Sequence, residues 1–282
     1  MVRRSAIATP QPPPSFDPKA YWEDRLTRHP GLTGVGSTLF GIYYIGWLYR
    51  VRRRVFYRLM RSLKDDFRSD SVFDIGSGTG FYLELWRKLG VKSVTGSDLT
   101  NASVSRLKAA FAPIRIIRMD IGGDLEASQH GRYNIVSAFD VLFHIVDDAH
   151  YGRALENAHS LLAPGGLFVF SDLLIHEPLT RGEHVVFRPL EAVMKELTRL
   201  GFEVVRRVPM FVMMEYPHDT KSRVYCFYWR VLTFLLRQSA WVGLVLGGIF
   251  YPIELVLTAL FRESPTTEII VCRKATGGIF RT

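Results

Sequence analysis

A run of glycines directly after a predicted strand is the most informative feature of the sequence. In residues 71–80, SVFDIGSGTG, apolar residues lead into Gly76, Gly78 and Gly80 at alternate positions. Glycines at this spacing allow the chain to turn sharply, and they let a ligand approach the backbone N–H groups without meeting a Cβ atom. The segment therefore predicts a loop that holds a nucleoside-bearing ligand, with Asp74 at its start.

Acidic side chains follow the next two predicted strands. Residues 93–98 are typical of a strand and end in Asp98, about 20 residues after the loop, where a carboxylate can accept hydrogen bonds from both hydroxyls of a ribose. Residues 114–119 form a run rich in isoleucine. The acid that follows, Asp120, suits an adenine amino group, and Ile121 suits the face of the adenine ring. We therefore expect both strand ends to contact the same ligand.

The remaining strands predict a parallel sheet. Residues 133–139 lead into Asp140, and the nearly all-apolar residues 167–170 lead into Ser171 and Asp172. Strands that are apolar on both faces and alternate with helical segments indicate a parallel sheet covered by helices. Such a sheet binds ligands at the carboxyl ends of its strands, which is where these acids fall.

Five segments together resemble the class I S-adenosylmethionine-dependent methyltransferases. In the order that this family uses, they are VFDIGSGTG (72–80), VTGSDLT (94–100), RMDIG (118–122), FDVLFHI (139–145) and LLAPGGLFVFSD (161–172). The resemblance covers about residues 70–208 and the last predicted strand. It implies an α/β fold with a Rossmann-like, doubly wound, mostly parallel seven-stranded sheet, and S-adenosylmethionine as cofactor. The residues implied to bind that cofactor are Asp74, Gly76, Ser77, Gly78, Gly80, Asp98, Leu99, Asp120, Ile121 and Phe139.

Two residues after the fourth predicted strand are candidates for catalysis. Methyl transfer is an in-line displacement, so the protein mainly aligns the acceptor and excludes water, and a base is needed only for a weakly acidic hydroxyl or carbon. His144 is our candidate base, because its pKa suits proton transfer near neutral pH. The alternative is a histidine that only packs or bonds to the backbone. Asp140 would orient His144, or would only favour the start of a helix through its charge.

The family places acceptor contacts beyond the fifth strand and under N-terminal helices that cover the cofactor. The implied substrate contacts are Tyr43, Tyr82, His184 and Arg188. Asp147, Asp148 and His150 have the side-chain types of a metal site, but their crowding is more typical of a solvated helix end. Asp172 is followed by Leu173 rather than by the asparagine of magnesium-dependent relatives. We therefore predict no metal.

Composition limits the partners and the compartment. The 282 residues are 48% hydrophobic, enough for a sizeable core, and carry a net charge of +9. This charge would suit a nucleic acid, but no zinc module or RNA-binding motif is present, so we expect a hydrophobic small-molecule acceptor and no nucleic acid. Cys226 and Cys272 are too few for a disulfide framework, and the start of the chain lacks the apolar core of a secretory signal. We expect a cytoplasmic protein and leave its oligomeric state open.

The chain divides into five predicted segments. They are a flexible proline-rich tail (1–16), an N-terminal helical cap (17–66), the cofactor-binding core (67–208), an apolar lid or acceptor insertion (209–265), and the last strand with a C-terminal tail (266–282). In the cap, Asp17 followed by Pro18 predicts a helix start.

A second helix is predicted within residues 38–64. Its apolar positions form one stripe, and its other face carries Arg50, Arg52, Arg53, Arg54, Arg58, Arg61 and Lys64. That face is either a solvated surface or a patch that meets anionic lipid or an acidic substrate. Helices at this place in the family cover the cofactor, so the resemblance puts Tyr43 and Tyr44 over the site.

The insertion contains two apolar runs of helix length, 224–236 and 240–261. The second is long enough to cross a bilayer and contains one charged residue, Glu254. A single span between adjacent strands of a sheet would separate the last strand from the others. We therefore favour an apolar lid or pocket wall that is peripheral to the inner face of a membrane.

Two functions remain open at this point. The first is a methyltransferase that acts on a hydrophobic small-molecule or lipid-like acceptor at oxygen, with carbon and nitrogen acceptors open. The second is a non-catalytic S-adenosylmethionine-fold protein associated with a membrane surface. The complete glycine loop with Asp98 favours the first, because a binding module has no physical need for the whole cofactor site.

Overall fold

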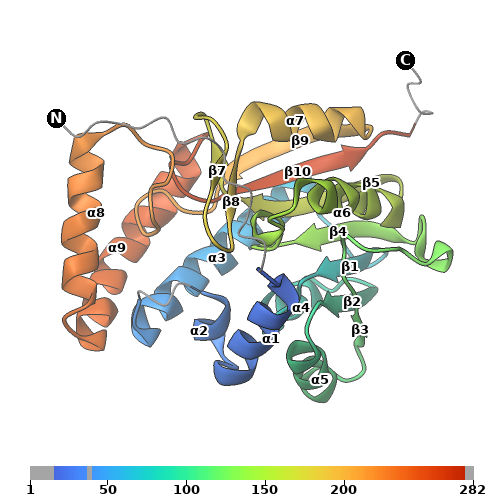
Figure 1. The fold of residues 1–282 in the computed structure, drawn as a ribbon, viewed down its shortest axis with the longest axis horizontal. Helices are drawn as coiled ribbons and strands as arrows, with labels where there is room; N and C mark the ends of the chain where they lie inside the picture. The colour runs from blue at the N-terminus through green and yellow to red at the C-terminus, as the bar shows by residue number, and fades with distance from the viewer. Residues whose placement is uncertain (1–15, 37–39, 277–282) are drawn as a thin grey trace.

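The computed structural model describes residues 16–36 and 40–276. The proline-rich tail predicted for residues 1–16 lies outside this part of the chain, apart from Phe16. The strands of the main sheet are β1 (Ser71–Ile75), β2 (Ser93–Asp98), β3 (Arg115–Arg118), β4 (Tyr133–Ala138), β5 (Leu162–Asp172), β9 (Phe202–Pro209) and β10 (Glu268–Lys274). Their order is β3-β2-β1-β4-β5-β10-β9 (Figure 1).

Only the pairings of β10 are antiparallel in this described sheet. β10 runs against both β5 and β9, whereas the other neighbours pair in parallel. The predicted Rossmann-like, mostly parallel seven-stranded sheet is therefore confirmed. A small second sheet follows β5 and contains β6 (Leu174–Ile175), β7 (Thr180–Arg181) and β8 (Val186–Pro189).

Helices cover both faces of the main sheet. They are α1 (Pro18–Arg28), α2 (Leu32–Val35), α3 (Ile42–Leu63), α4 (Phe81–Lys88), α5 (Asn101–Ala110), α6 (Asp148–Leu161), α7 (Leu190–Arg199), α8 (Arg223–Leu236) and α9 (Ala240–Leu260), with short 3-10 turns η1 (Ala127–Gln129) and η2 (Leu142–His144). Because successive strand residues point to opposite faces, Val72 packs in the core with α3 and α4, whereas Phe73 packs in the core with α6 and α7.

The N-terminal helices form where the sequence predicts them. The carboxylate oxygen Oδ1 of Asp17 accepts hydrogen bonds from the backbone N–H groups of Lys19 (2.9 Å) and Ala20 (3.1 Å), so Asp17 caps α1 as expected. α3 buries the apolar stripe that includes Val51, Val55 and Phe56.

The basic face predicted for α3 divides into residues with different environments. Arg52 is buried and pairs with carboxylates, so its predicted place on a solvated or lipid-facing surface is wrong. Arg58 donates hydrogen bonds to the carbonyl oxygens of Leu255 (3.3 Å) and Thr258 (2.6 Å) at the end of α9. Lys64 pairs with Asp70 at 2.7 Å. The remaining members of the basic face, Arg50, Arg53, Arg54 and Arg61, are exposed.

The insertion before β10 folds as the two predicted helices, α8 and α9. In Figure 1 they lie together at the end of the molecule away from β3. α9 packs along α3, where a Cβ atom added to Gly247 would lie only 2.2 Å from Cδ1 of Trp47. The indole N–H of Trp47 donates to the carbonyl oxygen of Leu244 at 2.9 Å. The absence of a side chain at Gly247 therefore allows the close approach of the two helices.

Candidate active site

The glycine loop turns between β1 and α4 as the sequence predicts. Gly76, Gly78 and Gly80 have φ angles of +64°, +52° and +84°, which side chains with a Cβ rarely adopt. Gly76 and Gly78 line a cavity of ≈ 500 Å³ together with Ser77. Gly80 does not line this cavity. It is instead the N-cap residue of α4, where a Cβ atom would meet the ring of Phe111 at 2.3 Å.

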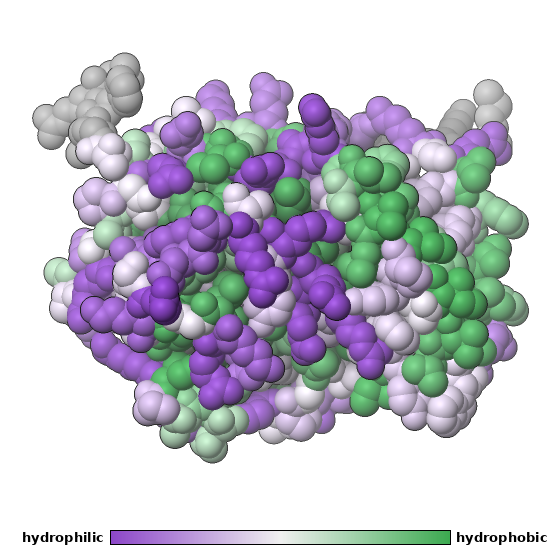
Figure 2. All heavy atoms as spheres, turned by 180° about the vertical axis from the view of Figure 1, so that it is seen from behind, coloured by the Kyte–Doolittle hydropathy of each residue, from purple (hydrophilic) through white to green (hydrophobic). Residues whose placement is uncertain are grey.

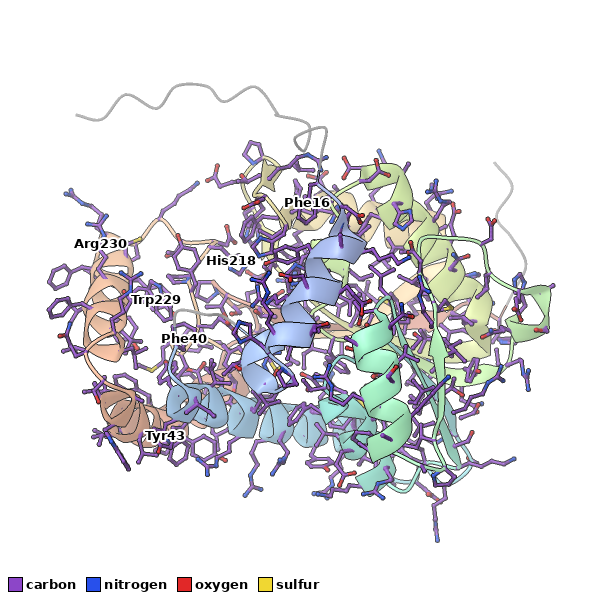
Figure 3. All side chains as sticks on the ribbon, turned by 60° about the horizontal axis from the view of Figure 1, so that its bottom comes forward. Phe16, Phe40, Tyr43, His218, Trp229 and Arg230 are labelled. Atoms are coloured by element: carbon purple, nitrogen blue, oxygen red, sulfur yellow. The ribbon has the colours of Figure 1, made fainter. Side chains whose placement is uncertain are left out.

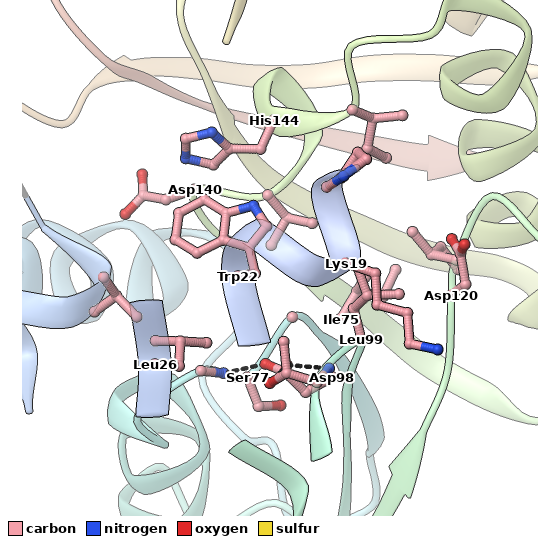
Figure 4. Close-up of a pocket in the computed structure, with 18 of the residues that line it drawn as sticks. Lys19, Trp22, Leu26, Ile75, Ser77, Asp98, Leu99, Asp120, Asp140 and His144 are labelled. Carbon is pink, nitrogen blue, oxygen red and sulfur yellow. Dashed lines mark hydrogen bonds between the residues drawn. The ribbon is translucent and has the colours of Figure 1, made fainter. Parts of the chain in front are cut away.

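Asp98 lies at the end of β2 beside this loop and lines the cavity (Figure 4). Its Oδ2 accepts the N–H of Gly78 at 2.9 Å, and its Oδ1 accepts the N–H and hydroxyl of Thr100 at 2.9 and 2.7 Å. Burial raises the pKa of Asp98, and these hydrogen bonds oppose that rise. The carboxylate thus holds the loop in place as well as facing the predicted ribose position.

Asp74 lies buried at the base of the glycine loop and does not line the cavity. Its Oδ1 accepts the hydroxyl of Ser137 at 2.6 Å, and Ser137 in turn accepts the indole N–H of Trp86 at 3.0 Å. Burial raises the pKa of Asp74 to about 7. The prediction that Asp74 contacts the cofactor is therefore corrected, because its carboxyl group is buried among Ser77, Ser137 and the strands.

The residues predicted to bind the adenine ring also lie at the cavity. Leu99, Asp120 and Ile121 all line it, as expected. Oδ1 of Asp120 lies 2.8 Å from Nε2 of His150 and accepts the N–H of Gly122 at 3.0 Å. His150, considered in the sequence only as a metal ligand, is thus a partner of Asp120. Among residues 16–36 and 40–276, no group of three or more His, Cys, Asp and Glu side chains is arranged to hold a metal ion.

Helix α1 lies across the cavity and contributes residues that the motifs do not include. Lys19, Trp22 and Leu26 point into it in Figure 4. The carboxylate of Glu23 fixes α1 by accepting the N–H groups of Asn101 (2.7 Å) and Ala102 (2.8 Å) at the start of α5. The Asp17 cap predicts this helix, and the family resemblance implies that N-terminal helices cover the cofactor, but neither indicates which residues of α1 contact the cavity.

His144 lies at the other end of the cavity from Asp98. Its Nδ1 lies 2.8 Å from the carbonyl oxygen of His184, so Nδ1 carries the proton and Nε2 is left to accept one. The ring of Trp22 stands edge-on to the imidazole, with ring centroids 4.7 Å apart. Burial lowers the pKa of His144 to about 3, against the opposing effect of the His184 hydrogen bond.

Asp140 lines the cavity but does not orient His144, so that prediction is wrong. The Asp140 carboxylate accepts the Arg52 guanidinium at 2.5 Å and the Ser171 hydroxyl at 2.9 Å. Arg52 also lies 3.6 Å from Glu215, and burial raises the pKa of Glu215 to about 7. Asp140 has a φ angle of 58°, an unusual conformation for a residue with a Cβ. Arg52 and Glu215 carry no motif signal, because they are distant in sequence from each other and from Asp140.

Aromatic rings line the cavity near Asp140. Tyr82 stacks on Phe139 with ring centroids 3.8 Å apart, and both residues line the cavity with Tyr49. The Tyr82 hydroxyl group is buried without a hydrogen-bond partner among the described residues. Phe139, expected to contact the cofactor, and Tyr82, expected to contact the substrate, thus both lie at the cavity.

Four other residues that the sequence places at the site do not line this cavity. Tyr43 is 38% exposed, and its ring centroid lies 5.1 Å from that of Trp241 on α9. Tyr44 is buried and donates to the carbonyl oxygen of Met214 at 2.9 Å, so neither tyrosine overhangs the site. Arg188 lies over the ring of Tyr151 at 3.6 Å and pairs with Asp148. His184 is not a lining residue but holds His144 through its carbonyl oxygen.

The insertion does not form a wall of this cavity. No residue of 209–265, all of which the structure describes, is among the residues that line it. Helix α9 packs instead against α3, on the side of α3 away from α1, and α8 packs against α9 (Figure 1). The predicted role of the insertion as a lid or acceptor wall is therefore wrong for this cavity.

Comparison with known proteins identifies the family. Residues 47–207 match the family described as "Methyltransferase domain". The chain belongs to the class I S-adenosylmethionine-dependent methyltransferase family. A ribosomal protein L11 methyltransferase of Staphylococcus aureus is 25% identical over 137 residues, which are 48% of this chain and 38% of that protein. The chain thus spans well under half of the length of this relative.

Solved structures share the fold. A methyltransferase from Leishmania major has a TM-score of 0.55 and 15% identity, over 72% of this chain and 78% of that one. The [4+2]-cyclase SpnF has a TM-score of 0.52 and 15% identity, over 80% and 81%. A putative sarcosine dimethylglycine methyltransferase from Galdieria sulphuraria has a TM-score of 0.51 and 14% identity, over 81% and 86%. At these identities the likeness shows the fold alone.

Proposed function

We propose that the protein is a methyltransferase that transfers the methyl group of S-adenosylmethionine to an oxygen atom of a hydrophobic small-molecule or lipid-like acceptor. The observation that carries this proposal is one continuous cavity of ≈ 500 Å³, which is lined by Asp98 and Asp120 as well as by His144. Small-molecule sites typically have volumes of about 300 to 1,000 Å³, so the cavity suits a nucleoside cofactor with part of an acceptor beside it.

The lining near His144 supports a hydrophobic acceptor. Trp22 contributes aromatic surface beside His144, and Ile145 and Val146 add aliphatic surface. Tyr49 and Tyr82 contribute further aromatic surface near Asp140. Because α1 lies across the cavity, a small acceptor fits the space more readily than a folded protein does. Asp140 and His144 are polar groups in this region and provide a means to orient a hydroxyl group.

Different residues around the cavity bind the cofactor, exclude water and accept the proton. S-adenosylmethionine supplies an electrophilic methyl group when it is bound. Gly76, Gly78 and Asp98 hold its nucleoside end, and α1 excludes water from the cavity. Nε2 of His144 accepts the hydrogen bond of the acceptor hydroxyl, takes its proton as the oxygen becomes positive, and passes it to solvent. A base with a low pKa suits this role only because the oxygen becomes strongly acidic during the transfer.

Replacing Asp98 tests the cofactor site. We expect Asp98→Ala to weaken S-adenosylmethionine binding by roughly 2 to 3 kcal/mol in a calorimetric titration. The substitution removes a buried carboxylate together with its hydrogen bonds to the ligand and to the loop. The control is Asp124→Ala, since Asp124 is exposed and does not line the cavity. Equal affinities of the two variants would remove Asp98 from the cofactor site.

Turnover separates an enzyme from a binding protein. A cell extract incubated with protein and S-adenosylmethionine should give a product that is heavier than its precursor by one CH₂ unit. We expect the precursor to partition into organic solvent and to have a hydroxyl group. Tight cofactor binding without turnover on any extract fraction would favour the non-catalytic alternative. Modification of a protein fraction alone would contradict the small-molecule acceptor.

A further inference from the structure

Helix α9 has one face held by the fold and an opposite face that is apolar and exposed. On the inner face, Gly247 lies against Trp47, and Glu254 accepts the backbone N–H groups of Val212 (2.7 Å) and Met213 (3.0 Å). The exposed side chains follow one another at intervals of three or four residues and are 44% to 74% exposed; they are Trp241, Val245, Ile249, Ile253, Val256 and Leu260. This spacing makes one continuous stripe along the helix.

Helix α8 has the same division. Trp229 faces the body of the protein, with its ring centroid 5.9 Å from that of Phe40 (Figure 3). Its outer side chains are 40% to 80% exposed and also recur at intervals of three or four; they are Val224, Phe227, Val231 and Phe234. We call these outer faces of α8 and α9, together with Ile42 and Tyr43 at the start of α3, the apolar edge.

Positive charge surrounds the apolar edge. Within residues 223–262 the charged residues are four exposed arginines and the buried Glu254; the arginines are Arg223, Arg230, Arg237 and Arg262. A second row of arginines, on the side of α3 that contacts α9, has helical spacing and consists of Arg50, Arg54, Arg58 and Arg61. Figure 2 shows the hydrophobic surface at the α8–α9 end beside a band of hydrophilic side chains.

The fold limits how this edge can meet a membrane. By length and composition α9 is able to cross a bilayer, and only 22% of its most apolar window is buried in the protein. Crossing would pull Glu254 from its backbone partners and Gly247 from Trp47, and it would strain the connection to β10, which pairs with β9. An orientation with α9 lying in the plane of the surface keeps all of these contacts.

We propose that the apolar edge docks on the surface of a bilayer that contains anionic lipid. Its apolar side chains enter the boundary between headgroups and acyl chains, and its arginines contact lipid phosphates. Charge favours lipid over a second copy of the chain, because a symmetric dimer through this edge would bring arginines against arginines. The proposal does not depend on the acceptor or on methyl transfer.

Vesicle flotation with the full chain tests the docking. We expect binding to vesicles of phosphatidylcholine with phosphatidylglycerol at low salt, and weaker binding to phosphatidylcholine alone. Added salt should weaken binding to the anionic vesicles without abolishing it, because salt screens the charges but not the apolar contact. No flotation with anionic vesicles at low salt would overturn the proposal. Equal, salt-independent binding to both vesicle types would overturn the role of the arginines.

Two sets of variants separate the contributions of charge and apolar surface. Arg54→Gln, Arg230→Gln and Arg237→Gln together should lower the partition coefficient about a hundredfold, since each basic residue near an anionic surface contributes about fivefold. The matched control removes three exposed positive charges elsewhere, with Lys108→Gln, Arg115→Gln and Lys195→Gln. It should lower binding far less, and an equal loss would show that only net charge matters and would overturn the proposal.

The apolar variant is Val245→Gln with Ile249→Gln. Both side chains are more than half exposed, so the fold should keep its melting temperature while vesicle binding falls at least tenfold. Binding that is unchanged in this variant would contradict insertion of α9. If sedimentation instead shows a dimer that these substitutions dissociate, and no vesicle binding occurs, the edge is a self-association surface and the proposal fails. Resistance of the membrane-bound protein to an alkaline carbonate wash would contradict a surface orientation.

Discussion

His144 is held as a neutral imidazole by its surroundings. Its Nδ1–H donates to the carbonyl oxygen of His184, and Trp22 covers the ring. Desolvation is the largest influence on this group and lowers its pKa to about 3. A histidine in this state offers the lone pair of Nε2 throughout the neutral range, whereas an ordinary histidine becomes protonated below about pH 6.5.

Replacement of His144 should therefore change the rate without changing cofactor binding. We expect His144→Gln to lower turnover about a hundredfold, because glutamine keeps the polarity but takes no proton. In the unmodified protein, kcat/KM should show no inflection near about pH 6.5, since His144 is already unprotonated there. An inflection at that pH that disappears in His144→Gln would contradict the buried, neutral state. Normal turnover of the variant would leave positioning as the whole mechanism.

At the level of elements, the packing of α9 on α3 fixes the insertion and the apolar edge. Tyr44 lies beside Gly243, Trp47 beside Gly247 and Arg58 beside Thr258, so the two helices run in the same direction. Glycine in a helix costs about 1 kcal/mol relative to alanine. Here Gly247 offsets that cost by leaving room for the indole of Trp47.

A methyl group at Gly247 should disturb this packing. The added Cβ would lie 2.2 Å from Cδ1 of Trp47, so Gly247→Ala should lower the free energy of unfolding by about 1 to 3 kcal/mol despite the gain in helix propensity. Gly46→Ala is the matched control on the partner helix, because a Cβ atom there meets nothing within 4 Å. It should be neutral or stabilising in urea denaturation. Equal stability of the two variants would disprove the close packing at Trp47.

Across the whole molecule, buried titratable groups act in opposite directions on stability. Burial raises the pKa of Asp172 to about 6 and of Glu215 to about 7. A carboxyl group whose pKa is raised in the folded protein stabilises the fold at low pH. This stabilisation is lost as the pH rises through the pKa of the group in the folded protein. Burial lowers the pKa of His218 to about 4, and this contribution is instead lost as pH falls from 6.5. Between about pH 4.5 and 6.5 the two trends oppose each other.

Single variants should separate the two trends. Relative to the unmodified protein, Glu215→Gln should gain stability as pH rises from 4.5 to 7, because it lacks the carboxyl whose contribution is lost over that range. The slope should be at most about 1.4 kcal/mol per pH unit. His218→Gln should show the opposite slope between pH 4 and 6.5. Urea denaturation across this range measures both, and parallel curves for all three proteins would contradict the shifted pKa values.

The sequence by itself determined the sheet, the cofactor loop and the main helices. Glycines with positive φ, apolar strands and acids at strand ends are local signals, and their order along the chain fixes the parallel topology. The Asp17 cap and the two apolar runs of the insertion are also local. Residues such as Asp98 and Ile121 were therefore found at the cavity as predicted.

Only the tertiary structure decided which side chains meet across long separations. Asp140 was expected beside His144 but pairs with Arg52, which is 88 residues away in sequence. Trp22 reaches the cavity because α1 packs on α5, and the insertion misses it because α9 packs on α3. These outcomes depend on how whole helices and strands pack together. The packing decides which of several compatible partners each side chain contacts. No spacing of residue types along the chain contains that information.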